Sequence, residues 1–132
     1  MLVNGAGELL LNLRAADASW YPDQWDLIGG HTEAEESAEE CIVRETIEET
    51  GARIPEFFPF RTYRLPLDGN VTLTYHVFYA RLDRPVESLI VGEGQEHRFF
   101  PAESLDGLEI APVSAQVLRD FVASREYRAW PH

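Results

Sequence analysis

Several features that would place this sequence in a common class of protein are missing from it. Its 132 residues include no lysine, and its single cysteine, Cys41, excludes an internal disulfide and a metal site built from several cysteines. No apolar run approaches the ~20 residues that a membrane-spanning helix requires. The first residues, MLVNGAGELLL, lack the basic start and long apolar segment of a signal peptide. We therefore expect a cytoplasmic protein without a membrane partner.

Positive charge is also scarce, since eleven arginines stand against 23 acidic residues and the formal net charge is −12. The field of such a chain repels phosphate, so we expect no nucleic-acid or anionic-membrane partner bound through a basic surface. A small phosphorylated ligand would need a local cation or a cluster of arginines. Every basic residue in the chain suits that task, because a guanidinium group can bind phosphate in a bidentate manner.

The composition that remains is that of an ordinary globular protein, with 45% hydrophobic residues, and we expect one domain over residues 1–132. Ser37 and Glu40 form a capping box that starts a helix at about 37–50, which Gly51 is suited to end. Apolar alternation and turn residues predict strands over 8–13, 71–82, 86–91 and 96–100, and a helix beginning at Pro112. They also predict a loop and short strand within 19–31, and a hairpin that pairs residues 61–67 with the strand over 71–82. Strands mixed with two helices predict an α/β (α+β) sandwich.

The predicted helix at 37–50 is crowded with negative charge. Between Glu33 and Glu49 the sequence holds eight glutamates and one arginine. On the helix Glu45, Glu48 and Glu49 are three and four residues apart, where each like-charge pair costs roughly 0.2–0.5 kcal/mol. Their arc also overlaps the face that carries Ile42, which we expect to turn toward the protein. Two interpretations fit: a solvated acidic face, or a hard divalent cation, Mg²⁺ or Mn²⁺, held by several carboxylates.

The spacing of residues around the glutamates favours the metal. The pattern is G-x5-E-x7-R-E-x-x-E-E-x-G, and it resembles the signature of the Nudix hydrolases, placed here at residues 30–52. The resemblance implies a Nudix-type α/β/α sandwich with a mixed β-sheet. It departs from the family pattern at three positions, where the signature favours two aliphatic residues and a glycine: Thr46, Ala52 and Glu35. The fixed positions are Gly30, Glu36, Arg44, Glu45, Glu48, Glu49 and Gly51.

The resemblance implies hydrolysis of a diphosphate linkage, with release of a nucleoside monophosphate. Glu45, Glu48 and Glu49 would hold the metal ions together with the backbone carbonyl of Gly30. Arg44 would either orient these carboxylates or form a plain salt bridge.

The general base stays open at this point. It is either Glu45 or one of two residues of a later glycine-rich segment, Glu93 and Glu96. The second of these is also a candidate metal ligand.

The substrate is the least determined feature. Arg14 and His31 are candidate phosphate contacts, and Trp25 is a candidate platform for a nucleobase. The resemblance implies a nucleotide substrate: a nucleoside triphosphate, a nucleotide sugar or ADP-ribose. The alternative is a catalytically silent nucleotide sensor with the same fold, which we would expect to have lost some of the carboxylates. A homodimer is compatible with the family, although nothing in the sequence specifies an interface.

Overall fold

The computed structural model describes residues 1–131, and within them six strands form one mixed sheet. The strands are β1 (Leu2–Val3), β2 (Leu9–Leu13), β3 (Trp25–Asp26), β4 (Phe58–Pro66), β5 (Thr72–Arg81) and β6 (Glu96–Phe100). The helices are α1 (Ala38–Thr50), α2 (Pro112–Val122) and α3 (Arg125–Arg128), with two short 3-10 helices, η1 (Val86–Ser88) and η2 (Ala102–Gly107).

Strand β2 is the centre of the sheet. Along one edge it pairs antiparallel with the whole of β6, and along the other it pairs antiparallel with β1 and then with β3. Strand β1 continues the sheet by pairing in parallel with β5, which forms an antiparallel hairpin with β4. Parallel and antiparallel pairs therefore coexist, as the predicted mixed sheet requires.

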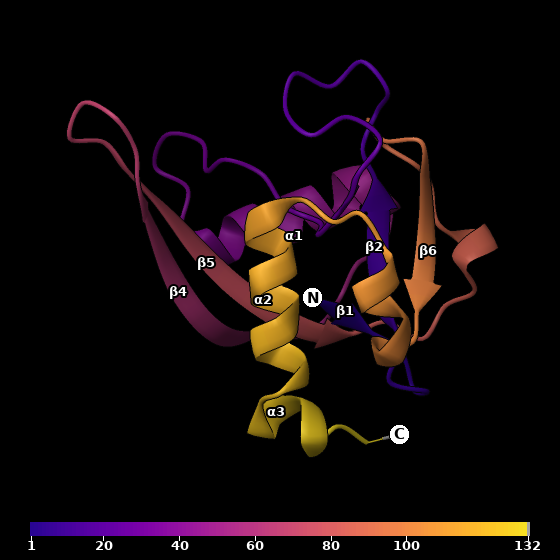
Figure 1. Ribbon diagram of the computed structural model, residues 1–132. Coiled ribbons are helices and arrows are strands. Elements are labelled where there is room, and N and C mark those ends of the chain that lie inside the picture. Colours follow the sequence, from indigo (N-terminus) through magenta and orange to yellow (C-terminus); the bar gives the residue numbers. More distant parts are fainter. Residues whose placement is uncertain (132) are drawn as a thin grey trace.

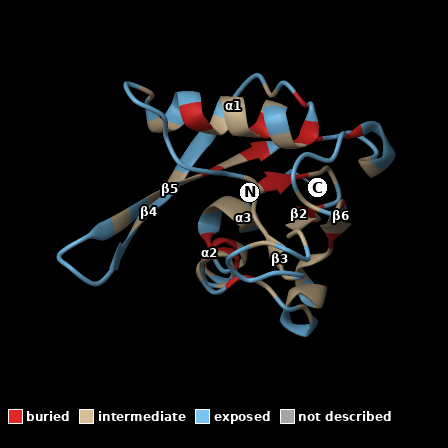
Figure 2. Cartoon of the chain, turned by 90° about the horizontal axis from the view of Figure 1, so that it is seen from above, coloured by how far each residue is buried: buried red, intermediate tan, exposed pale blue. Residues whose placement is uncertain are grey.

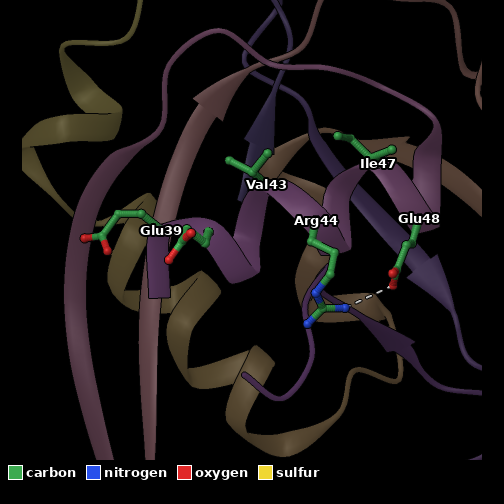
Figure 3. Close-up of a pocket in the computed structure, with 6 residues that line it drawn as sticks. Glu39, Val43, Arg44, Ile47 and Glu48 are labelled. Atoms are coloured by element: carbon green, nitrogen blue, oxygen red, sulfur yellow. Dashed lines mark hydrogen bonds and ion pairs between the residues drawn. The ribbon is translucent and has the colours of Figure 1, made fainter. Parts of the chain in front are cut away.

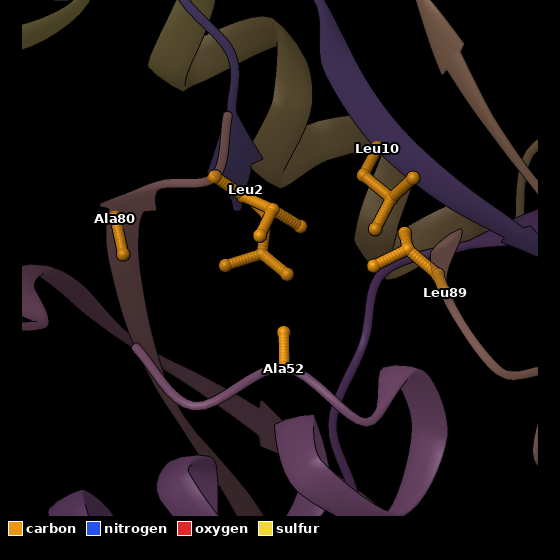
Figure 4. Packing of buried hydrophobic residues seen from close by; sticks show 6 residues of the cluster. Leu2, Leu10, Ala52, Ala80 and Leu89 are labelled. Carbon is orange, nitrogen blue, oxygen red and sulfur yellow. The ribbon is translucent and has the colours of Figure 1, made fainter. Parts of the chain in front are cut away.

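The run of leucines in β2 is explained by burial on both faces of the sheet. Leu9 and Leu11 pack with Leu118 and Phe121 of α2, whereas Leu10 points to the opposite face. On that face Leu10 belongs to a second buried cluster, which Figure 4 shows together with Leu2, Ala52, Ala80 and Leu89. With α1 on one face and α2 on the other (Figure 1), the predicted α/β/α sandwich is confirmed.

The β4–β5 hairpin extends beyond the two helices. Its outer part is almost entirely exposed, and Figure 2 shows it as a pale blue arm that projects from the body of the molecule. The predicted strand over 71–82 is confirmed as β5. The inner end of the hairpin joins the sheet, where Leu2 of β1 lies opposite Ala80.

Two features differ from the sequence prediction. Residues 86–91 do not form a strand, because the chain turns at η1, where the backbone N–H of Leu89 donates to Val86 O at 3.1 Å. Arg84 stabilises this turn by donating to Ser88 O at 2.9 Å. The short strand β1 was not predicted, since two buried residues carry no alternation that could be recognised.

Candidate active site

The carboxylates are positioned by a helix with well-defined ends. Ser37 accepts a hydrogen bond from the Glu40 backbone at 3.0 Å, and the Glu40 side chain accepts one from the Ser37 backbone at 3.0 Å. This capping box begins α1 as predicted. Gly51 ends the helix in the left-handed conformation, with φ at 75°, where a side chain would be strained.

Arg44 lies at the centre of the first group of carboxylates. Its guanidinium donates two hydrogen bonds to Glu36, at 2.7 and 3.0 Å, and one to Glu45 at 2.9 Å. A weaker bond reaches Glu48 at 3.2 Å on the outer side of the helix (Figure 3). Arg44 also donates to His31 O at 3.1 Å, which fixes the loop before the helix, and it lies 3.7 Å from Glu33 Oε1 and 3.7 Å from Cys41 Sγ.

The hydrogen bonds between Arg44 and Glu36 shift the pKa of both side chains. The hydrogen bonds and charge of Arg44 lower the pKa of Glu36 to about 2, and Glu36 in turn raises the pKa of Arg44 further above its ordinary value. The side chains of Glu36 and Arg44 are 12% and 24% exposed, so the ion pair is partly sheltered from water. Glu36 therefore belongs to a structural ion pair with Arg44.

Gly30 lies directly against Glu45. A Cβ atom at Gly30 would come within 2.4 Å of Glu45 Oε1, so only glycine leaves the carboxylate its present place. The Gly30 carbonyl faces the same helix and accepts a hydrogen bond from the Cys41 thiol, with sulfur and oxygen 3.6 Å apart. The glycine before the helix thus allows the loop to approach Glu45 closely.

Glu49 belongs to a second group, and within residues 1–131 no arginine forms an ion pair with Glu49 itself. A Cβ atom at Gly92 would lie 2.7 Å from Glu49 Oε2, so the loop before β6 passes close to this carboxylate. Burial, and then the negative charges of Glu45 and Glu93, raise the pKa of Glu49, while a hydrogen bond from the Glu93 backbone opposes the shift. Glu45 and Glu93 therefore each lie close enough to repel Glu49.

This arrangement suits a divalent cation. Within residues 1–131, no three His, Cys, Asp or Glu side chains already stand in a geometry that would hold a metal ion. The donors nevertheless fit a hard ion, because partly buried Glu49 feels the negative charge of Glu45 on the same helix and of Glu93 in the loop before β6. A bound Mg²⁺ or Mn²⁺ would offset both the burial and the repulsion that raise the pKa of Glu49.

The glutamates predicted as metal ligands or bases differ in which residues they contact. Glu48 is turned toward Arg44, with 56% of its side chain exposed. Glu96 forms an ion pair with Arg98 at 2.9 Å, whereas Glu93 is exposed in the loop beside Glu49. Of the two late glutamates, Glu93 thus lies at the carboxylate group. Glu45 and Glu93 both act on Glu49, whereas Glu48 shares Arg44 Nη1 with Glu45.

The three candidate substrate contacts lie in different surroundings. Arg14 is already engaged, since it forms an ion pair with Asp26 at 2.9 Å and donates to Trp20 O at 2.8 Å. Trp25 packs edge-on against Phe100, with ring centroids 4.8 Å apart, in the hydrophobic cluster on the α2 side of the sheet. The side chain of His31 is exposed. A role in substrate binding stays a prediction for all three.

Two residues of the site were not singled out from the sequence. Gly92 leaves the space that Glu49 occupies, and buried His97 donates from Nε2 to the Glu49 backbone carbonyl at 2.7 Å. A sequence signal existed for His97, because alternation along EHRFF places it on the same face as Phe99, which packs on the α1 side. Nothing in the sequence alone connected either residue to α1.

The fold and the carboxylate-rich helix agree with the comparisons to known proteins. The NUDIX domain model matches residues 1–121, and the chain belongs to the Nudix family. An uncharacterised Nudix hydrolase from Pseudomonas aeruginosa is 34% identical, over 90% of this chain and 72% of that protein. The crystal structure of a MutT protein from Methanosarcina mazei superposes with a TM-score of 0.75 at 22% identity, covering 94% of this chain and 91% of that one.

Two relatives with named activities are longer than this chain. A prenyl-diphosphate phosphatase from Methanosarcina mazei is 29% identical over 83% of the chain, and an NAD-capped RNA hydrolase from Pseudomonas aeruginosa is 28% identical over 92%. The chain spans 61% of the first protein and 41% of the second. Among residues 1–131, no helix combines the length and apolar character needed to cross a membrane.

Proposed function

We propose that this chain hydrolyses a phosphoric anhydride linkage with the help of a divalent metal ion, Mg²⁺ or Mn²⁺. The observation that carries the proposal is that partly buried Glu49 is repelled by Glu45 and by Glu93, while the loop at Gly92 lies directly against its carboxylate. Two glycines, Gly30 and Gly92, lie where a side chain would collide with Glu45 or Glu49. Such an arrangement is costly in the absence of a cation and favourable in its presence.

The surroundings of each side chain indicate its role in the proposed reaction. Glu45 and Glu49 would hold the metal, together with the Gly30 carbonyl, and Glu48 would join them only by turning away from Arg44. When bound, the metal neutralises charge on the diphosphate oxygens and lowers the pKa of a coordinated water. Arg44 holds Glu45 in place through the bond at 2.9 Å.

The reaction is the attack of a water oxygen on phosphorus. A new phosphorus–oxygen bond forms, the bridging phosphorus–oxygen bond breaks, and the leaving phosphate or phosphorylated group departs with the electron pair. A carboxylate accepts the proton that the water loses. Glu93 is the base we favour over Glu96, because Glu96 is paired with Arg98 whereas Glu93 lies beside Glu49. Glu45 is the competing base, in the case that Glu49 and Glu48 suffice to hold the metal.

A nucleotide is the substrate class we propose, either a nucleoside triphosphate, a nucleotide sugar or ADP-ribose. The named relatives widen the range to be tested, since one acts on prenyl diphosphates and the other on NAD-capped RNA. All of these compounds share a phosphoric anhydride. We therefore propose that the bond cleaved is a phosphoric anhydride, and experiment must identify the group attached to it.

A panel of substrates with product analysis tests the proposal. Nucleoside triphosphates, nucleotide sugars, ADP-ribose, a prenyl diphosphate and an NAD-capped RNA are each incubated with Mg²⁺ or Mn²⁺, and with a chelator as control. We expect metal-dependent cleavage at an anhydride, with a nucleoside monophosphate as product from the best nucleotide. A folded, metal-binding protein that turns over none of these substrates would favour the sensor alternative.

A further inference from the structure

His97 forms a hydrogen bond with the backbone in the last turn of α1. Its side chain is buried, with 6% of the residue exposed, and Nε2 lies 2.7 Å from the Glu49 backbone oxygen. A carbonyl oxygen only accepts hydrogen bonds, so Nε2 carries the proton. In the neutral ring Nδ1 is then an acceptor, and no atom of residues 1–131 donates to it.

Asn12 lies directly opposite His97 on the neighbouring strand β2. Residues paired in this way project to the same face of the sheet with their Cβ atoms about 5 Å apart. The Asn12 Oδ1 atom is also buried and, within the described residues, has no donor. Gly94 closes the space above it, since a Cβ atom there would lie 2.3 Å from Oδ1.

These two buried acceptors belong to directly paired residues, and neither has a donor within the described residues. Neither can satisfy the other while both present lone pairs, and an unsatisfied buried acceptor is rare in folded proteins. A water molecule has two protons to donate and typically occupies polar sites of this kind. A water between Asn12 Oδ1 and His97 Nδ1 would also keep the imidazole in the tautomer that donates to Glu49.

We propose that Asn12 and His97 are positioning residues for Glu49, and that they act through one ordered water between their side chains. The inference rests on the proposed function in one respect, that Glu49 is a metal ligand. The hydrogen bond from His97 fixes the Glu49 backbone. The Glu49 carboxylate lies against Gly92 and accepts a hydrogen bond from the Glu93 backbone. The last turn of α1 contains no basic residue, so His97 supplies the donor that this helix end needs.

Metal affinity separates positioning from a purely structural role. Mn²⁺ binding is measured by titration, with electron paramagnetic resonance reporting free Mn²⁺. We expect His97→Leu to weaken binding about 10–100-fold, the usual effect of losing a partner that orients a metal ligand. His97→Gln keeps an N–H donor for the Glu49 carbonyl, and we expect it to retain most of the affinity. His76→Gln, at an exposed histidine of β5, is the matched control.

Activity and thermal melting complete this experiment. We expect His97→Leu to lower kcat more than it raises KM, and His97→Gln to restore kcat, although both variants lower the Tm of the metal-free protein. A folded His97→Leu protein with wild-type Mn²⁺ affinity would overturn the inference. A His97→Gln protein as defective as His97→Leu would overturn it as well, because a retained donor should rescue the site.

A second measurement does not depend on the proposed function. Nitrogen-15 NMR of the metal-free protein reports which ring nitrogen of His97 is protonated. We expect the neutral ring with its proton on Nε2, and partial loss of this tautomer in Asn12→Leu. A ring protonated on Nδ1 would overturn the inference even if the enzyme is active. If the wild-type protein binds no metal, the proposed function fails, and the tautomer alone decides whether Asn12 and His97 form this pair.

Discussion

Two groups of carboxylates meet at helix α1 and differ in how their charge is balanced. In the first, Arg44 contacts Glu36, Glu45 and Glu48, and the pKa of Glu36 falls to about 2. In the second, Glu49 faces Glu45 and Glu93, and its pKa rises. Glu45 belongs to both groups, because it is the carboxylate that Arg44 holds toward Glu49.

The difference separates crowded negative charge that is balanced by an arginine from crowded negative charge that is not. The Arg44 group is complete without a ligand, and its hydrogen bonds order the loop before α1. In the second group, the pKa of Glu49 is lowered only by a hydrogen bond from the Glu93 backbone and by the nearby His97, and these do not cancel the rise caused by burial, Glu45 and Glu93. Such a group is stabilised by an added cation, so metal binding should raise the stability of the folded protein.

The strongest test of the comparison is Glu49→Gln. We expect metal-dependent activity to fall by about 10²–10³-fold, the range for losing one group that stabilises charge in the transition state. We expect the Tm of the metal-free protein to hold or to rise, because the neutral amide is not repelled by Glu45 and Glu93. Enzyme kinetics and thermal melting without metal measure both effects.

The matched control is Glu39→Gln, at an exposed glutamate in the first turn of the same helix. It removes one charge from α1 outside both groups, so activity should stay near that of the wild type. Full metal-dependent activity in Glu49→Gln would remove Glu49 from the proposed metal site and would leave Glu45 and Glu48 as its ligands.

A smaller effect on activity is expected from Gly92→Ala. The added methyl group would lie 2.7 Å from Glu49 Oε2 and 3.2 Å from Glu48 O, so either the loop or the carboxylate must move. A displacement of about 1 Å in a catalytic group can cost 10²-fold in rate, and we expect a loss of about 10–100-fold. Gly107→Ala is the control, since no atom lies within 4 Å of its added methyl group. Equal activity in Gly92→Ala and Gly107→Ala would show that the loop before β6 can accommodate a methyl group beside Glu49.

The first group should be sensitive to acid. The pKa of Glu36 is about 2 in the folded protein, against 4.5 for a free side chain. A lowered pKa stabilises the folded state fully above pH 4.5, and this contribution is lost as the pH falls toward 2. We therefore expect Arg44→Gln to lower stability at pH 7 and to weaken the decline of stability between pH 4.5 and 2.

Urea unfolding across this pH range measures the effect. Arg98→Gln is the control, because it removes an arginine from an exposed pair with Glu96 and should change stability much less. If Arg44→Gln and the wild-type protein lose stability in parallel below pH 4.5, other acidic residues cause the decline and the Arg44 group is not the sensitive one.

The sequence was sufficient to predict the features that depend on neighbours along the chain. The capping box at Ser37, the left-handed Gly51 and the alternation of β5 are all local patterns, and the structure confirms each of them. Thr46, which occupies a position where the family favours an aliphatic residue, is 1% exposed and packs as a small core residue.

The meeting of distant segments could not be predicted from spacing. Helical periodicity grouped Glu48 with Glu45 and Glu49, yet Glu48 is turned toward Arg44. Glu93 reaches Glu49 from a loop more than forty residues away, and the choice between Glu93 and Glu96 depended on which of them has an arginine partner. Contacts of this kind follow from how β6 pairs with β2, which no local pattern encodes.

The smallest expected effect concerns a glutamate that belongs to neither group. Glu35 has φ at 66°, in the left-handed region, at a position where the family often has glycine. That conformation costs a residue with a Cβ atom about 1–2 kcal/mol, and a glycine at position 35 would remove this cost. The more flexible unfolded state of a glycine chain opposes the gain in stability by about 0.5–1 kcal/mol. We expect Glu35→Gly to stabilise the protein by about 0.5–1 kcal/mol in urea unfolding, with unchanged Mn²⁺ affinity.

Glu35→Ala separates the backbone from the charge, because alanine removes the carboxylate and keeps the Cβ atom. If the strain of the left-handed backbone is the cause, only the glycine variant gains stability. An equal gain in both variants would assign the effect to charge repulsion instead, and the acidic loop before α1 would then extend the unbalanced charge beyond the Glu49 group. A change in Mn²⁺ affinity in Glu35→Gly would mean that this loop, through the Arg44 group, contributes to the metal site.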